Sequence, residues 1–265
     1  MLITVTYQNG TEEEFNSFED IDKSEKKLLM DKLDCTNNKL TSLPNNLPPN
    51  LTVLNCCWNK LTSLPNNLPP NLTKLYCSFN KLTSLPNKLP PNLTKLSCNY
   101  NNLTSLPNKL PPNLTELDCR YNNLTSLPNK LPHNLTELDC SVNKLTSLPN
   151  NLPPNLTELN CNLNELTSLP DLPPNLTHLN CNLNKLTSLP NLPPNLTYLD
   201  CRFNKLTSLP NLPPNLTHLY CSFNKLTSLP NLPPNLTHLY CSNNELTSLP
   251  NLPPNLTHLY CSNNE

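Results

Sequence analysis

The sequence is poor in glycine, in charge and in long apolar runs, and each shortage excludes a class of protein. A single Gly among 265 residues, set against 32 Pro, argues against an ordinary globular domain. Only 14% of the residues are charged and the formal net charge is -1, so no global field points to nucleic acid or to an anionic membrane. No apolar run approaches the ~20 residues that a membrane-spanning helix needs.

The N-terminus also lacks a targeting signal. Residues 1–7 alternate in polarity as a strand does. They contain no basic segment, apolar core or small-residue cleavage site of the kind that a signal peptide has. We therefore expect a cytoplasmic protein with neither a signal peptide nor a transmembrane segment.

A repeated unit occupies almost the whole chain. The pattern Leu-Thr-x-Leu-x-Cys-x-x-Asn-x-Leu-Thr-Ser-Leu-Pro-x-(x)-Leu-Pro-Pro-Asn recurs from Met30 onward, first with a period of 21 residues and then with a period of 20. Such regular apolar spacing excludes a disordered proline-rich tract and predicts a repeat fold. The repeats span residues 30–50, 51–71, 72–92, 93–113, 114–134, 135–155, 156–175, 176–195, 196–215, 216–235, 236–255 and, in part, 256–265.

Each unit resembles the leucine-rich-repeat consensus L-x-x-L-x-L-x-x-N-x-L. In the unit that starts at Leu51, Cys56 takes the third apolar position. The residues around Leu54 predict a short strand whose side chains alternate inward and outward. Leu-Pro and Leu-Pro-Pro steps predict an extended or polyproline-like return path, because proline fixes φ and cannot donate a backbone hydrogen bond. The predicted fold is a β-rich solenoid, a leucine-rich-repeat horseshoe with a parallel β-sheet on its concave face and an extended convex face.

The short unit with Leu-Pro-x-Leu-Pro-Pro-Asn-Leu is similar to the YopM and IpaH type of bacterial effector repeat over residues 30–265. Near-identical repeats are also typical of leucine-rich-repeat proteins of giant amoeba-infecting viruses, so the source stays open. Either origin implies the host cytoplasm. IpaH proteins carry a ubiquitin-ligase domain after the repeats, and this sequence has nothing after them. The resemblance therefore implies a non-catalytic protein, with a ligase relative that lacks its catalytic domain as one alternative.

Residues 1–29 predict a separate α+β cap. Residues 2–7 are expected to form a strand, residues 8–10 a turn and residues 11–15 a returning strand. Ser17 is expected to cap a helix that continues through Leu29 and shields the core of the first coil. The apolar stripe of that helix would consist of Phe18, Ile21, Leu28 and Leu29.

No similar cap follows the last repeat, so we expect the strand at residues 259–262 to be a bare edge. Pairing of this edge with a second chain would make the protein a structural or assembly component. Self-association is therefore the second alternative to a binding function.

Two residue types recur at inward positions, and both predict structural roles. A cysteine in each coil predicts a small buried apolar side chain, and no spacing typical of structural zinc is present, so we expect no metal and no cofactor. Cys57 alone should face outward, where a reactive thiol would have no nearby base to activate it. An asparagine three residues after each cysteine should satisfy backbone groups at the bend. The cysteines are Cys35, Cys56, Cys77, Cys98, Cys119, Cys140, Cys161, Cys181, Cys201, Cys221, Cys241 and Cys261.

The outward strand positions vary between repeats, so information about a partner would lie there. They predict a basic zone, an acidic zone and a His/Tyr zone along the concave face. The candidate residues are Glu116, Asp118, Glu137 and Asp139 in the acidic zone, and His218, Tyr220, His238 and Tyr240 in the His/Tyr zone.

A second outward position, just after each strand, carries a large apolar or aromatic residue in nine consecutive coils. One interpretation is that these side chains pack over the neighbouring coil. The other is a strip that binds a protein, because aromatic residues dominate interface hot spots. The predicted function is a non-catalytic interaction module for a protein partner of unknown identity. The residues are Trp58, Phe79, Tyr100, Tyr121, Val142, Leu163, Leu183, Phe203 and Phe223.

Overall fold

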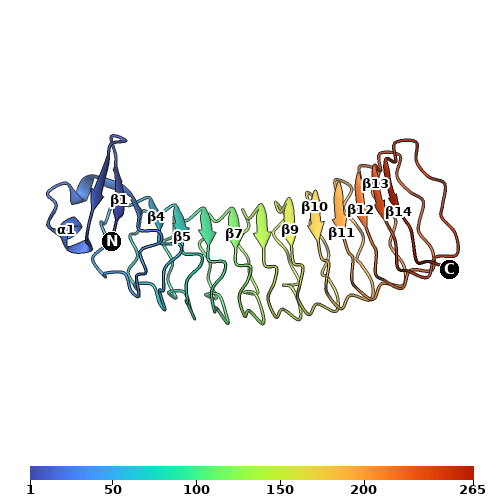
Figure 1. Cartoon of the computed structure of the whole chain (residues 1–265), viewed down its shortest axis with the longest axis horizontal. Helices are drawn as coiled ribbons and strands as arrows, with labels where there is room; N and C mark the ends of the chain where they lie inside the picture. Colours follow the sequence, from blue (N-terminus) through green and yellow to red (C-terminus); the bar gives the residue numbers. More distant parts are fainter. The chain divides into compact units, whose positions relative to one another are not determined.

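The computed structural model describes residues 1–265 as two compact units. Unit 1 comprises residues 1–124 and 130–135, and unit 2 comprises residues 125–129 and 136–265. Both units are parallel β-solenoids with one short strand in each coil, and the strands of each unit lie side by side in Figure 1. The only helices are α1 (Phe18–Lys23) and a 3₁₀ turn at Lys27–Leu29. The predicted solenoid is therefore confirmed.

Unit 1 begins with an antiparallel hairpin and continues with parallel strands. Strand β1 pairs with β2 on one side and, also antiparallel, with β3 on the other. The next four strands follow β3 in parallel, with one inward leucine opposite the next. The strands are β1 (Ile3–Tyr7), β2 (Glu12–Phe15), β3 (Met30–Asp34), β4 (Val53–Asn55), β5 (Lys74–Tyr76), β6 (Lys95–Ser97) and β7 (Glu116–Asp118).

Unit 2 repeats the same strand in every coil. Its strands pair in parallel and in register, so that identical positions of successive coils stand opposite one another. A register fixed by one inward leucine per strand leaves both neighbouring side chains facing outward. The strands are β8 (Glu137–Asp139), β9 (Glu158–Asn160), β10 (His178–Asn180), β11 (Tyr198–Asp200), β12 (His218–Tyr220), β13 (His238–Tyr240) and β14 (His258–Tyr260).

The return path of each coil carries no helix or strand, as the prolines predict. It ends in a β-turn over Pro-Pro-Asn-Leu, where the Leu72 N–H donates to the Pro69 carbonyl at 3.2 Å. Pro70 holds the second position of this turn, which its fixed φ favours. Because the turn recurs at Leu93, Leu114 and later coils, it returns the chain to the next strand at the same point each time.

The cap forms its predicted hairpin, but the predicted helix is wrong in length. Ser17 does cap α1, since its Oγ accepts from the Asp20 N–H at 3.1 Å. The helix ends after Lys23, and Ser24 turns the chain by donating its N–H to the Ile21 carbonyl. Leu28 and Leu29 are 62% and 53% exposed, so they are no part of a buried stripe. Ile21 is the one buried residue of α1, and Phe18 is half-buried. So little apolar burial does not extend the helix across the polar residues 23–27.

The hairpin, rather than the helix, takes the place of a coil before the first repeat. Ile3 and Val5 of β1 are fully buried over the first coil. The backbone of Leu2 meets Asn38, whose Oδ1 accepts from the Leu2 N–H at 2.7 Å and whose Nδ2 donates to the Leu2 carbonyl at 2.5 Å. In later coils the asparagine at the equivalent position forms hydrogen bonds with the preceding coil. The hairpin takes the place of that coil and supplies the partners of Asn38. The division of the chain into a cap and repeats at residue 30 stays a prediction.

Candidate functional site

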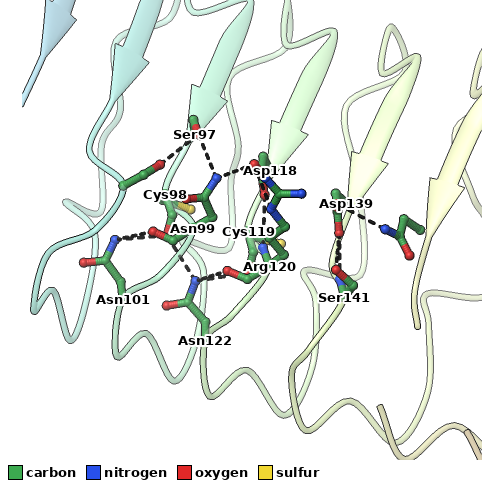
Figure 2. Close-up of polar contacts among 12 residues, drawn as sticks. Ser97, Cys98, Asn99, Asn101, Asp118, Cys119, Arg120, Asn122, Asp139 and Ser141 are labelled. Carbon is green, nitrogen blue, oxygen red and sulfur yellow. Dashed lines mark hydrogen bonds and ion pairs between the residues drawn. The ribbon is translucent and has the colours of Figure 1, made fainter. Parts of the chain in front are cut away.

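The asparagine ladder lies inside the coils and holds each bend to the preceding coil. The Nδ2 of Asn101 donates to the carbonyls of Cys98 and Asn99 in its own coil at 3.1 and 3.2 Å (Figure 2). It also donates to the Cys77 carbonyl at 3.0 Å, and its Oδ1 accepts from the Leu82 N–H at 2.9 Å, both in the preceding coil. One amide thus satisfies backbone groups of two coils, which would otherwise be buried without partners. The predicted structural role of these asparagines is confirmed.

The cysteine ladder is also interior. Its thiols are fully buried in most coils, and some donate to a carbonyl of the next coil, as Cys77 does to Ser97 at 3.4 Å. Burial raises the pKa of the Cys35 and Cys161 thiols to about 12. Thiols held in this neutral form are poor nucleophiles and poor metal ligands. The ladder therefore belongs to the core.

Cys57 is only half-buried, and its thiol is not activated. Burial, the largest effect, raises its pKa above the ordinary value, while hydrogen bonding to Ser78 acts in the opposite direction. A raised pKa lowers the thiolate fraction at neutral pH. Cys57 is thus more exposed than the neighbouring ladder cysteines, and no reactive role follows from its surroundings.

The strand face of unit 1, meaning the outward side chains of β3–β7, carries a basic row beside a polar row. In the basic row, Lys95 on β6 forms an ion pair with Glu116 on β7. In the polar row, the Asp118 carboxylate accepts a hydrogen bond from Asn99 and lies 3.5 Å from the Arg120 guanidinium (Figure 2). The two predicted acidic residues of this unit thus share one strand, and both already contact basic or amide groups.

The strand face of unit 2, the outward side chains of β8–β14, starts acidic. Glu137 and Asp139 lie on β8, and Asp139 accepts hydrogen bonds from the Ser141 hydroxyl at 2.6 Å and the Asn160 amide at 3.2 Å. Farther along, Asp200 on β11 is 1% exposed and receives two hydrogen bonds from the Arg202 guanidinium, at 2.9 and 2.7 Å. The sequence did not single out this pair, because Asp200 stands at an outward repeat position and its burial depends on neighbouring side chains.

The His/Tyr zone of unit 2 consists of two parallel ladders of stacked rings. The rings of His218 and His238 lie 4.3 Å apart, and those of Tyr220 and Tyr240 lie 4.7 Å apart. The in-register pairing of β12 and β13 places each ring over its equivalent. The structure thus brings the four predicted residues of this zone together.

Threonine hydroxyls fix the tautomer of these histidines. The Thr217 Oγ1 donates its only proton to the Thr197 carbonyl at 2.9 Å. Its 2.8 Å contact with the His218 Nδ1 therefore requires the imidazole to donate. Burial, followed by the charges of the neighbouring histidines, lowers the pKa of His218. The neutral His218 ring is the favoured form, with its Nε2 as the remaining acceptor.

The rim, defined as the nine positions from Trp58 to Phe223 that follow the strands, contains a stacked column in unit 1. The ring centroids lie 3.8 Å apart from Trp58 to Phe79, 4.2 Å from Phe79 to Tyr100 and 4.1 Å from Tyr100 to Tyr121, with interplanar angles of 7–11°. Phe203 and Phe223 stack in the same way in unit 2 at 4.2 Å. The packing interpretation is therefore confirmed, yet Trp58 stays 56% exposed and Tyr121 stays 42% exposed.

The rim has a backbone feature that the sequence analysis missed. Every rim residue has a positive φ, from +49° at Leu163 to +58° at Phe223, and this includes the β-branched Val142. Left-handed backbone costs a residue with a Cβ about 1–2 kcal/mol. Asn37, Asn243 and Asn263 hold the same position in other coils, and asparagine tolerates this conformation well. Those three asparagines were the available signal.

The last strand differs from its equivalents. All three residues of β14 are exposed, and Leu259 is 37% exposed where the matching leucine of β13 is fully buried. Assembly through this strand stays a prediction.

Two kinds of site are not found. No group of three or more His, Cys, Asp or Glu side chains is placed to hold a metal ion. No helix has the length and apolar character needed to cross a bilayer.

Family models and solved structures identify the repeat. The model of leucine-rich repeats in two copies matches residues 194–234 and 214–254, and the single-repeat model matches residues 113–133. No curated protein sequence matches the chain. YopM from Yersinia enterocolitica WA-314 is 42% identical, with a TM-score of 0.76 over 89% of this chain and 56% of that one. This chain thus spans little more than half the length of that relative.

Two further structures are similar over most of this chain. YopM from Yersinia pestis, described as a leucine-rich effector protein, is 32% identical, with a TM-score of 0.53 over 88% of this chain and 83% of that one. The functional domain of InlJ from Listeria monocytogenes, described as including a cysteine ladder, is 31% identical, with a TM-score of 0.63 over 90% and 64% of the two chains. The protein belongs to the leucine-rich-repeat family.

Proposed function

We propose that this protein is a non-catalytic module that binds a protein partner through its rim and the adjacent strand faces. The leucine-rich-repeat fold is typical of protein interaction modules. The proposal assigns partner contacts to Trp58, Phe79, Tyr100, Tyr121, Phe203 and Phe223 on the rim, to Glu116 and Asp118 in unit 1, and to Glu137, Asp139, His218, Tyr220, His238 and Tyr240 in unit 2.

The exposed ring column of unit 1 carries the proposal. Trp58, Phe79, Tyr100 and Tyr121 form a continuous apolar strip on the surface, which costs solubility, and each occupies a left-handed backbone position, which costs stability. In three other coils an asparagine adopts the same left-handed backbone, which it tolerates better than an aromatic residue does, and it adds no apolar surface. Strain together with surface apolar area supports a binding role, because a buried aromatic anchor contributes strongly to an interface.

The free thiols support a reducing compartment. The ladder cysteines lie in equivalent places in adjacent coils and remain unpaired, and thiols stay reduced in a cytoplasm. We place the protein in the cytoplasm, which for a delivered effector would be that of the host.

A peptide selection tests the proposal without knowledge of the partner. A random-peptide display library would be selected on the full chain and then screened on the rim variant Phe79→Asn, Tyr100→Asn, Tyr121→Asn. Asparagine is the replacement of choice because Asn37, Asn243 and Asn263 already show that it keeps the backbone of this position. We expect enriched peptides that bind the native chain and lose binding to the variant.

A matched control separates binding from folding. Asn102→Ala changes an exposed side chain of the coil that contains Tyr100, outside the rim, and should leave peptide binding unchanged. Circular dichroism would verify the fold of both variants. Enriched peptides that bind the rim variant as tightly as the native chain would overturn the role of the rim.

A further inference from the structure

We infer that the rim of unit 1 recognises an acidic, extended peptide segment that carries apolar side chains. This inference rests on the proposed function and specifies the chemistry of the partner. The recognition surface consists of the ring column from Trp58 to Tyr121 together with three exposed lysines, Lys39, Lys60 and Lys81.

The lysines stand beside the rim at a fixed spacing. Lys60 follows Trp58 by two residues, and Lys81 follows Phe79 by two residues. Since consecutive Cα atoms are 3.80 Å apart, each lysine Cα lies within about 7.6 Å of its ring-bearing Cα. The asparagine between them turns inward, so the lysine and the ring both remain at the surface. An apolar row and a second lysine row, distinct from the basic row of the strand face, therefore run side by side along consecutive coils.

The ammonium groups of this second lysine row have no carboxylate partner. None of Lys39, Lys60 and Lys81 lies within ion-pair distance of an acidic side chain. The acidic side chains of the strand face already have partners, because Asp34 accepts hydrogen bonds from the Thr36 N–H and the Asn55 amide, Glu116 pairs with Lys95, and Asp118 contacts Arg120. The uncompensated charge at this rim is positive, although the chain as a whole is slightly negative. Electrostatic complementarity favours an acidic partner.

The orientation of the rings points to the same partner. Phe79 and Tyr100 each have a ring on both sides at 3.8–4.2 Å, so their faces are covered and only their edges meet solvent. The edge of an aromatic ring carries partial positive charge, and the face carries partial negative charge. A column seen edge-on therefore attracts carboxylate oxygens while still offering carbon surface to apolar side chains.

The covered faces argue against single-stranded nucleic acid, the other polymer that basic and aromatic residues bind. Proteins bind such strands by stacking each base on a free ring face. In this column the inner faces are already stacked, and only the outer faces of the two end rings, Trp58 and Tyr121, have no ring against them. Two faces at opposite ends of the column cannot hold a run of bases. An extended peptide, which rises about 3.3 Å per residue, can follow the column along its edges.

Fluorescence anisotropy with defined probes tests this inference. The probe is a labelled synthetic peptide of four Asp-Asp-Leu repeats, compared with an Asn-Asn-Leu peptide and an oligothymidine of equal length. We expect the full chain to bind the acidic peptide best, and we expect this binding to weaken with added salt, because exposed charges are screened. The double variant Lys60→Glu, Lys81→Glu should bind the acidic peptide about tenfold more weakly.

The control variant is Lys88→Glu, Lys109→Glu, which changes the net charge equally in the same unit but on the return path. We expect it to bind as the native chain does. Equal weakening by both variants, or equal binding of the neutral peptide, would overturn the inference, and preference for the oligothymidine would replace it with a nucleic-acid site. If peptides from the display selection need the rim rings but bind the Lys60→Glu, Lys81→Glu variant unchanged, the proposed function stands and the acidic partner does not. If they need neither rings nor lysines, both fail.

Discussion

The interior ladder and the rim occupy consecutive residues of every coil, yet they follow opposite rules. Asn243 occupies the position equivalent to the rim in its coil, with a φ of +58°, and its side chain faces outward. Asn244, the next residue, is buried and donates to the carbonyls of Cys221 and Cys241 at 3.1 and 3.0 Å. The same residue type is thus obligatory at one position and replaceable at the next. The difference is whether the side chain or only the backbone completes the bend.

This contrast explains why the ladder position is always asparagine, whereas the residue at the rim position varies between coils. At the ladder position an amide must reach two coils at once, and no other short side chain offers both donors and an acceptor there. At the rim position the side chain leaves the bend, so Trp, Phe, Tyr, Val, Leu and Asn all occur. The interior position is therefore constrained by folding stability, whereas folding leaves the residue type at the outward position free to vary. Four predictions test this division.

The largest effect should come from alkaline pH, which acts chiefly on the buried thiols of the interior ladder. Burial raises the pKa of the thiols, to about 12 for Cys35, Cys161 and Cys241. A raised folded-state pKa gives stability that is complete below the unfolded value near 9 and is lost as pH rises toward 12. Each buried thiol should cost about 1.4 kcal/mol per pH unit above 9, and together they should unfold the chain.

Chemical denaturation under reducing conditions at pH 8, 9 and 10 would measure this loss. The double variant Cys140→Ala, Cys161→Ala should reduce the slope of stability against pH by about 3 kcal/mol per pH unit. Stability that stays constant from pH 8 to 10 would refute a buried neutral ladder.

The next effect should come from a single ladder amide. Asn101→Ala should lower the free energy of unfolding by about 3 kcal/mol, because the Leu82 N–H and the Cys77 carbonyl lose their partner inside the coil. Asn102→Ala, at the exposed neighbour, should change it by less than about 0.5 kcal/mol. Urea unfolding of the two variants would compare them directly. Similar losses in both would erase the distinction between the ladder and its neighbours.

A smaller effect should expose the strain of the rim. Phe79→Gly and Phe79→Ala both remove the same two ring contacts, but only glycine accepts the φ of +54° without a steric cost. The glycine variant should therefore be more stable than the alanine variant by about 1 kcal/mol. Thermal melting would give the order. An alanine variant that equals or exceeds the glycine variant would mean that the rim backbone is unstrained.

The smallest effect should come from acid, which acts on the outer face. Burial lowers the pKa of His218 below its ordinary value. A lowered histidine pKa gives stability that is present above pH 6.5 and is lost as pH falls through the folded-state value. NMR titration should find the His218 midpoint below that of a free histidine, with the proton of the neutral ring on Nδ1. A normal midpoint, or an Nε2 proton, would contradict the threonine contact.

The sequence alone was sufficient for every feature that depends on period. A recurrent Leu-x-Cys-x-x-Asn spacing predicts which side chains face inward, because a coil that starts at the same point must repeat the same geometry. This reasoning located the strands, the cysteine ladder, the asparagine ladder and the rim, and it produced the resemblance to leucine-rich repeats. It also located the cap hairpin, whose Asn-Gly turn is a local signal.

Only the tertiary structure decided the features that depend on contacts between coils. The end of α1 at Lys23 follows from how little of the helix is buried, and the local sequence does not reveal that. The positive φ of the rim arises where the Trp58 and Asn59 N–H groups both donate to the next coil. The edge-on column exists because in-register coils bring Trp58, Phe79, Tyr100 and Tyr121 to stacking distance. Period fixes the direction of a side chain, whereas backbone strain, ring stacking and pKa depend on neighbours that lie some twenty residues away in the chain.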